Sequence, residues 1–235
     1  MTAPASARSH QHADNLVRTL HGIFGNRLRS IVSYNVDQSE ALATLVLVTS
    51  LTLADLEACA ARSHGWHRDH VATPLLLPED EFRRSLDAFP LEYVEMARAH
   101  EVLFGANPFD EVPIDRFDLR RASETRIKSH LVHLREAFIE AGGIPRAVSE
   151  LVTASAPAFG ALLRNVARLN GSTATDRAAA TRDGARTAGL PDSIVSDILA
   201  LEQPSDVRMT DAARLFPAYL SAVEQLAGYV DRWNV

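Results

Sequence analysis

The strongest constraint in this sequence is a change of pattern about halfway along the chain. Between residues 30 and 105, short apolar runs alternate with stretches of helical periodicity, which is typical of a small α/β unit. From residue 116 to residue 235, apolar residues recur only at helical spacing. We therefore predict an α+β (α/β) chain in which a small mixed-sheet domain is followed by an all-α helical bundle.

The domain limits follow from where the pattern breaks. Residues 1–12 have no apolar periodicity and are predicted to form a flexible tail, after which Asp14 caps the first helix. The α/β domain is predicted over residues 13–108. The Gly105-Ala106-Asn107-Pro108 break places the boundary near residues 106–117, and the helical bundle domain is predicted over residues 116–235.

Individual elements are predicted from periodicity and end signals. Thr52 and Asp55 have the spacing of a helix-capping box and begin a helix that places Cys59 on its inner face. Each apolar run in the first half is predicted as a strand; these runs are Ile31–Tyr34, Leu42–Val48, Val71–Leu77 and Leu91–Met96. The predicted helices of the second half cover residues 116–141, 144–169, 175–187, 194–201 and 210–233.

Composition narrows the class of protein and its compartment. The net charge of −6 argues against a general nucleic-acid-binding protein, which normally shows a basic footprint. One cysteine cannot form an internal disulfide, so we expect the protein in a reducing compartment. No apolar run approaches the length of a signal-peptide core or a membrane span. We therefore expect a cytoplasmic protein with no nucleic-acid or membrane partner.

Histidines and the cysteine supply the first candidates for chemistry. His64, His67 and His70 are spaced three apart, so imidazoles on one helix face could hold a transition metal. Gly65 is expected to interrupt that helix, and structural zinc sites use four converging ligands, so a polar helix end is the competing interpretation. Cys59 is either a nucleophile or a buried inert thiol, and its apolar helix position favours the second.

A family resemblance is carried by the order of elements and by two segments. The run SIVSY leads into a polar turn and then into Leu45-Val46-Leu47-Val48, and a later segment reads TPLLLPEDEFRRSLDAFPLEYVEMARAHEVLFGANPF. The chain thereby resembles minimal and kanamycin nucleotidyltransferase-like proteins with a C-terminal helical domain, over about residues 14–235. The later segment is similar to one found in a bacterial subgroup. The resemblance implies Mg²⁺ and a nucleoside triphosphate as cofactors of an active member.

The departures from the family concern the residues that perform catalysis. Tyr34-Asn35 stands where the family has Gly-Ser, and Leu42 and Thr44 stand where its two metal-binding aspartates belong. Glu92 is the best match to a third carboxylate that can come from the last strand. The favoured interpretation of Glu92 and Glu95 is that they lie on a solvated strand edge or pair with Arg98.

Two functional classes follow from this degenerate site. The favoured one is a nucleotidyltransferase-like pseudoenzyme without cofactor, with a binding, regulatory or scaffold role. Its partners are expected to be a protein or a second copy of the chain, with a nucleotide as a further candidate ligand. The alternative is a divergent Mg²⁺-dependent nucleotidyltransferase that transfers a nucleoside monophosphate to a small molecule or protein. Its catalytic candidates are Asp37, Glu40 and Glu92.

Overall fold

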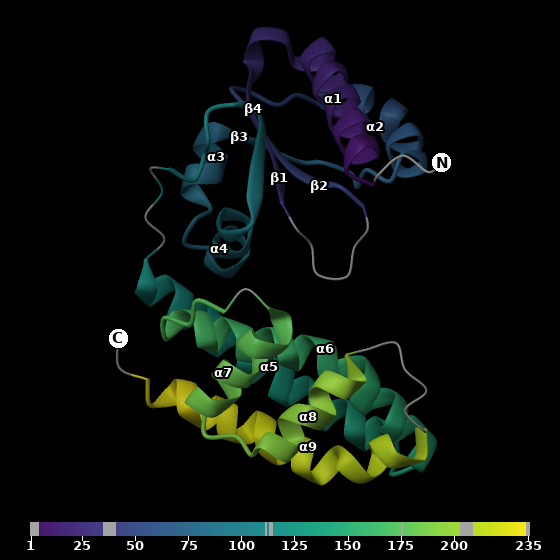
Figure 1. Cartoon of the computed structure of the whole chain (residues 1–235), viewed down its shortest axis with the longest axis vertical. Coiled ribbons are helices and arrows are strands. Elements are labelled where there is room, and N and C mark those ends of the chain that lie inside the picture. The colour runs from purple at the N-terminus through teal and green to yellow at the C-terminus, as the bar shows by residue number, and fades with distance from the viewer. Residues whose placement is uncertain are drawn as a thin grey trace. The chain divides into compact units, whose positions relative to one another are not determined.

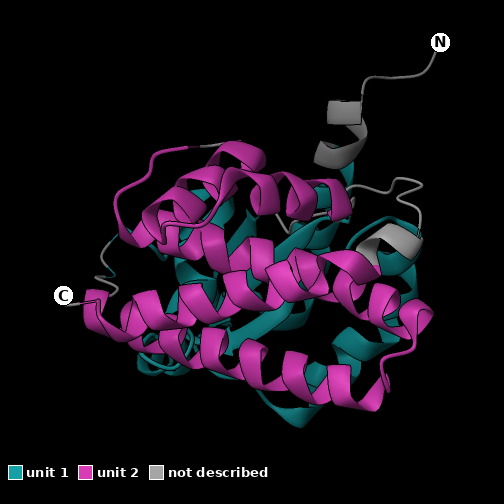
Figure 2. Cartoon of the chain, turned by 90° about the horizontal axis from the view of Figure 1, so that it is seen from below, with its two compact units in different colours: residues 1–114 teal, residues 115–235 magenta. Residues whose placement is uncertain are grey.

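The computed structural model describes residues 5–34, 41–110, 112, 115–174, 176–202 and 209–233. The chain divides into two compact units, Met1–Ile114 and Asp115–Val235 (Figures 1 and 2). The first unit contains a mixed sheet between helices, and the second is helical. The predicted α+β fold class with a helical portion is therefore confirmed. No helix among the described residues is both long and apolar enough to cross a membrane.

The sheet of the first unit has the strand order β3-β2-β1-β4. β1 (Leu28–Tyr34) is antiparallel to β2 (Ala43–Val48) and to β4 (His100–Gly105). β3 (Leu75–Pro78) runs parallel to β2, and α2 (Leu53–Arg68) makes the connection that a parallel pair requires. The central strands are buried on both faces, which explains their continuous apolar sequences.

Helices cover both faces of this sheet (Figure 1). On one face, α1 (Ala5–Phe24) and α2 pack their apolar side chains against Ile31, Val46 and Val48. On the other face, α3 (Glu79–Arg84) and α4 (Pro90–Arg98) contribute Phe82 and Tyr93 to a second cluster. Because successive side chains of a strand point to opposite faces of the sheet, each strand contributes to two separate apolar cores.

Several sequence predictions for this unit are corrected. Residues 91–96 belong to helix α4, because Pro90 suits a first helical turn and the following residues are good helix formers. The last strand is instead His100–Gly105, whose exposed edge position weakened its apolar signal. α1 begins at Ala5, so residues 5–12 are helical and not a tail, while residues 1–4 lie outside the described residues. The predicted Thr52–Asp55 capping box is confirmed.

Gly105 fixes the point where β4 leaves β1. Its φ is +77°, a conformation that favours glycine, and a Cβ there would overlap the backbone carbonyl of Arg29. The close approach of these two strands therefore requires glycine at this position. It also sets the path of the segment that follows, residues 106–110.

The second unit is a helical bundle in which α6 (Pro145–Leu169) packs against the other helices. These are α5 (Arg116–Glu140), α7 (Arg177–Thr187), α8 (Asp192–Leu201) and α9 (Met209–Asp231). All five predicted helices are confirmed to within a few residues. Their periodic apolar faces meet in one core.

Large apolar side chains of the bundle face inward. Phe159, Leu163, Phe216 and Tyr219 are all buried in its single core, and Tyr229 is partly buried against that core. Tyr219 is therefore unsuitable as a probe of a dimer surface, because its substitution by Glu would disrupt the core.

Candidate functional site

β2 carries no acidic residue on either of its faces. Thr44 is buried and shares the α1/α2 face with Val46 and Val48, and Leu42, just before the strand, packs on the same core. The opposite face carries Ala43, Leu45 and Leu47. The positions matched to the family's metal-binding aspartates therefore point into apolar surroundings.

Glu92 was expected on the last strand, and this placement is corrected. Glu92 lies in the first turn of α4, not on a strand. The acid on the last strand is Glu101, which is exposed and pairs in register with Ser33 of β1. Ser33 in turn pairs with Thr44, so Thr44, Ser33 and Glu101 form one cross-strand row. A correct strand assignment for residues 100–105 would have placed Glu101 on the last strand.

The remaining acidic candidates are Asp37 and Glu40. Both lie outside the described residues, in the segment that joins Tyr34 to Ala41. Tyr34 ends β1, and burial raises the pKa of its hydroxyl. Beside Tyr34, the described part of this end of the sheet carries the hydroxyls of Ser33 and Thr44, the carboxylate of Glu101 and the imidazole of His100.

The histidines do not converge. α2 continues through Gly65 to Arg68, contrary to the expected interruption, and His64 and His67 are both exposed. His70 follows the helix with a φ of +55° and is also exposed, while His67 Nε2 lies 3.0 Å from Thr73 Oγ1. Among the described residues, no group of three metal-binding side chains is assembled.

Cys59 is buried on α2 against the apolar core. Burial raises the pKa of its thiol, and the negative charge of Asp55 raises it further. A nucleophilic cysteine needs a lowered pKa and access to a substrate. Cys59 therefore has the environment of a structural side chain.

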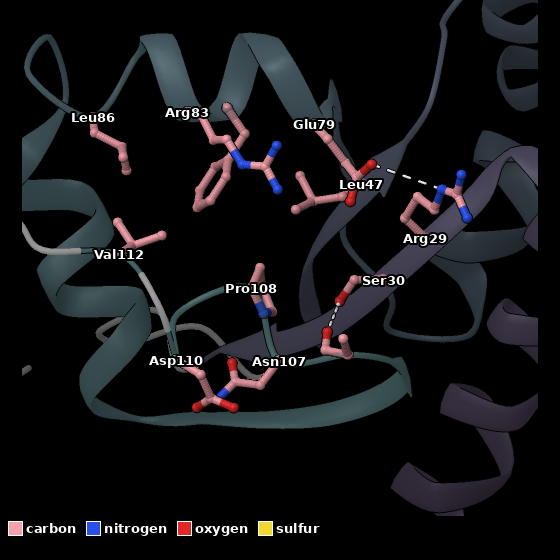
Figure 3. Close-up of a pocket in the computed structure, with 12 residues that line it drawn as sticks. Arg29, Ser30, Leu47, Glu79, Arg83, Leu86, Asn107, Pro108, Asp110 and Val112 are labelled. Atoms are coloured by element: carbon pink, nitrogen blue, oxygen red, sulfur yellow. Dashed lines mark hydrogen bonds and ion pairs between the residues drawn. The ribbon is translucent and has the colours of Figure 1, made fainter.

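A pocket of about 610 Å³ opens at the other end of β1, on the α3/α4 side of the sheet (Figure 3). It is lined by Arg29 and Ser30 from the start of β1 and by Leu47 from the end of β2. α3 and the residue 106–112 segment supply its other walls. Ser30 is buried, and its hydroxyl donates a 2.7 Å hydrogen bond to the carbonyl of Ala106, which fastens that segment to β1. Sequence reasoning missed this pocket.

The helical unit contains a smaller groove of about 360 Å³ between α5 and α6. Both His130 and His133 line it, and His130 is half-buried. The His130 ring stacks on Phe159 with a centroid distance of 6.0 Å, and its Nε2 lies 3.3 Å from the Tyr219 hydroxyl. Burial lowers the pKa of His130, and the neighbouring His133 lowers it further.

Comparison of the chain with protein-family models finds no match, and comparison with curated proteins finds none either.

Proposed function

We propose that this chain is a nucleotidyltransferase-like protein without transferase activity, whose role is to bind a ligand or a partner protein. The observation that supports this most directly is that β2 carries no acid on either face. Nucleotidyl transfer needs Mg²⁺ to neutralise developing charge, and Mg²⁺ needs several oxygen ligands in octahedral geometry. A buried threonine hydroxyl and the single carboxylate of Glu101 are a poor set for this ion.

The environment of Thr44 adds a second argument. Its side chain is almost fully buried, and its hydroxyl has no hydrogen-bond partner among the described residues. A dication at this position would lie against the apolar core around Val46, and burying an uncompensated charge costs far more than a protein of this size can supply. The site therefore favours a packing role for β2.

The competing function is a divergent, active nucleotidyltransferase. It is favoured by one observation, which is that the last strand does present an acid, Glu101, beside β1. Asp37 and Glu40 would have to complete the ligand set. Glu92, on α4, is a weaker third member than Glu101 because it does not belong to the cross-strand row.

Transfer chemistry is tested with labelled nucleoside triphosphates and Mg²⁺ or Mn²⁺, using small molecules and proteins as acceptors. We expect no labelled product. Product formation that disappears in Glu101→Gln, but persists in the exposed-acid control Glu140→Gln, would establish the competing function. Glu92→Gln is assayed in parallel. Loss of activity in Glu92→Gln but not in Glu101→Gln would identify Glu92, on α4, as the third carboxylate.

Self-association is tested separately by light scattering over a dilution series. A molar mass that stays at 25.7 kDa at every concentration removes a second copy of the chain as the partner. A mass that rises toward twice this value would support a dimer, which is the commonest symmetric assembly.

A further inference from the structure

The pocket beside α3 is lined by both apolar and charged side chains. Leu86, Pro108 and Val112 are partly exposed and form its apolar surface, whereas Leu47 and Phe82 lie behind them and are almost fully buried. The volume of about 610 Å³ lies within the range of small-molecule sites. The apolar part of this lining can contact a compact hydrocarbon or aromatic group.

Four ionisable side chains surround this interior, two of each sign. Arg29 and Glu79 face each other with a separation of 3.7 Å between Nε and Oε2, which is too long for a hydrogen bond. Asp110 accepts a hydrogen bond of 2.6 Å from the Asn107 amide. Arg83 forms no hydrogen bond or ion pair within the described part of the chain.

Figure 3 shows Arg83 on α3 and Asp110 on the segment after β4, on opposite sides of the pocket. The guanidinium of Arg83 therefore has its donors available at the opening, whereas the carboxylate of Asp110 is already engaged by an amide. An Arg guanidinium matches the two oxygens of a carboxylate in a bidentate arrangement.

We propose that this pocket binds a small monocarboxylate with an apolar body, held by Arg83 at its charged end and by Leu86, Pro108 and Val112 along its body. The site lies at the opposite end of β1 from the Thr44–Ser33–Glu101 row. It is independent of whether the chain transfers nucleotides.

A carboxylate meets less repulsion from the acids around the pocket than a phosphate ester does. Arg29 and Arg83 oppose Glu79 and Asp110, so the four ionisable side chains sum to zero and supply no excess positive charge for a dianion. The repulsion from Glu79 and Asp110 acts on any anion, and it is about twice as large for a doubly charged phosphate as for a carboxylate.

The test uses the full chain and titration calorimetry at low ionic strength, with 3-phenylpropanoate as the probe. We expect saturable binding of 3-phenylpropanoate below about 10 mM, a range suited to so small a ligand. The neutral 3-phenylpropanamide should bind about tenfold more weakly, because it lacks the charge that Arg83 recognises. Propanoate, which lacks the ring, and phenyl phosphate should each also bind about tenfold more weakly.

The matched variants are Arg83→Gln and Arg84→Gln. Both arginines are exposed on α3, but Arg84 pairs with Asp80 and does not line the pocket, so neither change should alter the fold, which circular dichroism checks. We expect Arg83→Gln to weaken 3-phenylpropanoate binding about tenfold and Arg84→Gln to leave it unchanged.

Three results would overturn the proposal. These are no binding of 3-phenylpropanoate at the highest concentration, equal affinity for the acid and its amide, and equal weakening by Arg83→Gln and Arg84→Gln. Tighter binding of phenyl phosphate than of 3-phenylpropanoate would reject the carboxylate as the ligand class. Failure of this site leaves the transferase assay unaffected, so the two proposals fail independently.

Discussion

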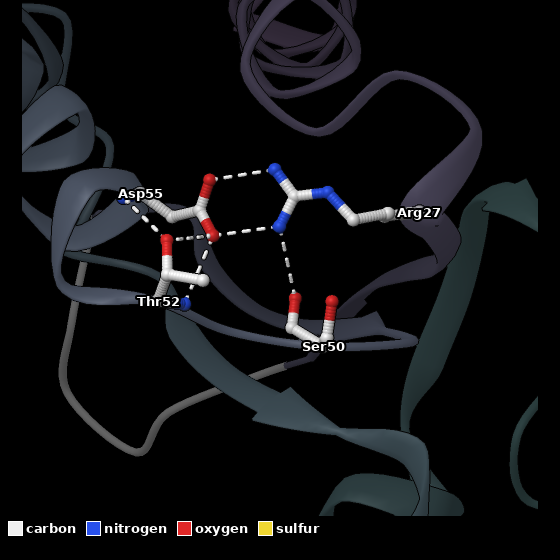
Figure 4. A network of polar contacts seen from close by, with 4 residues as sticks. All are labelled: Arg27, Ser50, Thr52 and Asp55. Carbon is white, nitrogen blue, oxygen red and sulfur yellow. Dashed lines mark hydrogen bonds and ion pairs between the residues drawn. The ribbon is translucent and has the colours of Figure 1, made fainter.

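The carboxylate of Asp55 accepts hydrogen bonds from both terminal nitrogens of Arg27, each 2.7 Å long (Figure 4). The same carboxylate accepts from the backbone N–H and the hydroxyl of Thr52, while the Thr52 hydroxyl accepts from the Asp55 N–H. Arg27 also donates to the Ser50 carbonyl. One buried carboxylate therefore joins the turn before β1 to the start of α2 and caps that helix.

We predict that Asp55→Asn lowers the free energy of unfolding of the first unit by about 1.5–3 kcal/mol, the range for hydrogen bonds to charged groups. The control is Asp80→Asn, which removes an exposed pair with Arg84 and should change stability by less than about 1 kcal/mol. Urea unfolding is followed by Trp66 fluorescence in a Trp233→Phe background. Equal losses in the two variants would mean that the Arg27–Asp55 pair stabilises the fold no more than an exposed ion pair does.

The stabilisation by Asp55 should depend on pH in a defined direction. Hydrogen bonds from Arg27, and then from Thr52, hold the pKa of Asp55 well below its usual range. A depressed folded-state pKa contributes stability above the unfolded-state value of about 3.9, and this stability is lost as the pH falls below that value. The difference between wild type and Asp55→Asn should therefore narrow below about pH 4. A constant difference from neutral to acidic pH would contradict this prediction.

His130 predicts a second pH dependence, in the helical unit. Burial lowers its pKa below the ordinary value of 6.5, so the folded state favours the neutral ring. The unfolded state then binds the proton more readily, and the bundle should lose stability as the pH falls through about 6.5. His130→Gln should flatten this dependence, whereas His133→Gln, at an exposed position, should leave most of it. Unfolding is followed by Trp233 in a Trp66→Phe background.

Val46 and Leu75 form a matched pair that tests the placement of the strands. Val46 is 0% exposed in the centre of the sheet, whereas Leu75 on β3 is 39% exposed. Val46→Asp buries an unpaired charge and should cost about 4 kcal/mol, while Leu75→Asp should cost about 1 kcal/mol. Similar losses from the two changes in urea unfolding would contradict the strand arrangement described above.

The helical unit could be predicted from sequence because its signal is local. Buried positions such as Ile127 and Leu134 recur at helical spacing, and glycines or prolines mark the helix ends. The secondary structure of residues 90–105 could not be predicted from the sequence, because tertiary packing decides between helix and strand in this segment. Tyr93 and Met96 alternate poorly as strand residues but share a helix face against the sheet.

The candidate sites also differ in how far the sequence could predict them. The lack of an acid on β2 is visible in the sequence, because it concerns consecutive residues in one apolar run. The pocket is not, because Arg29, Leu47, Arg83 and Asp110 are separated along the chain and meet only through the sheet order and the path after Gly105. Sequence reasoning had no local signal that could connect these residues.

Gly184 tests how closely two helices of the bundle approach, and Gly65 on α2 of the first unit serves as its matched control. A Cβ at Gly184 on α7 would overlap the backbone carbonyl of Leu163 on α6, and a backbone atom cannot move aside cheaply. Gly184→Ala should therefore destabilise the helical unit by about 2 kcal/mol, as overpacking does. At Gly65, inside α2, the nearest neighbour of a new Cβ is the flexible Arg68 side chain at 3.8 Å. Gly65→Ala should stabilise the first unit by about 0.5–1 kcal/mol through helix propensity. Urea unfolding in the two single-tryptophan backgrounds measures both changes, and a stabilising Gly184→Ala would show that α6 and α7 lie farther apart.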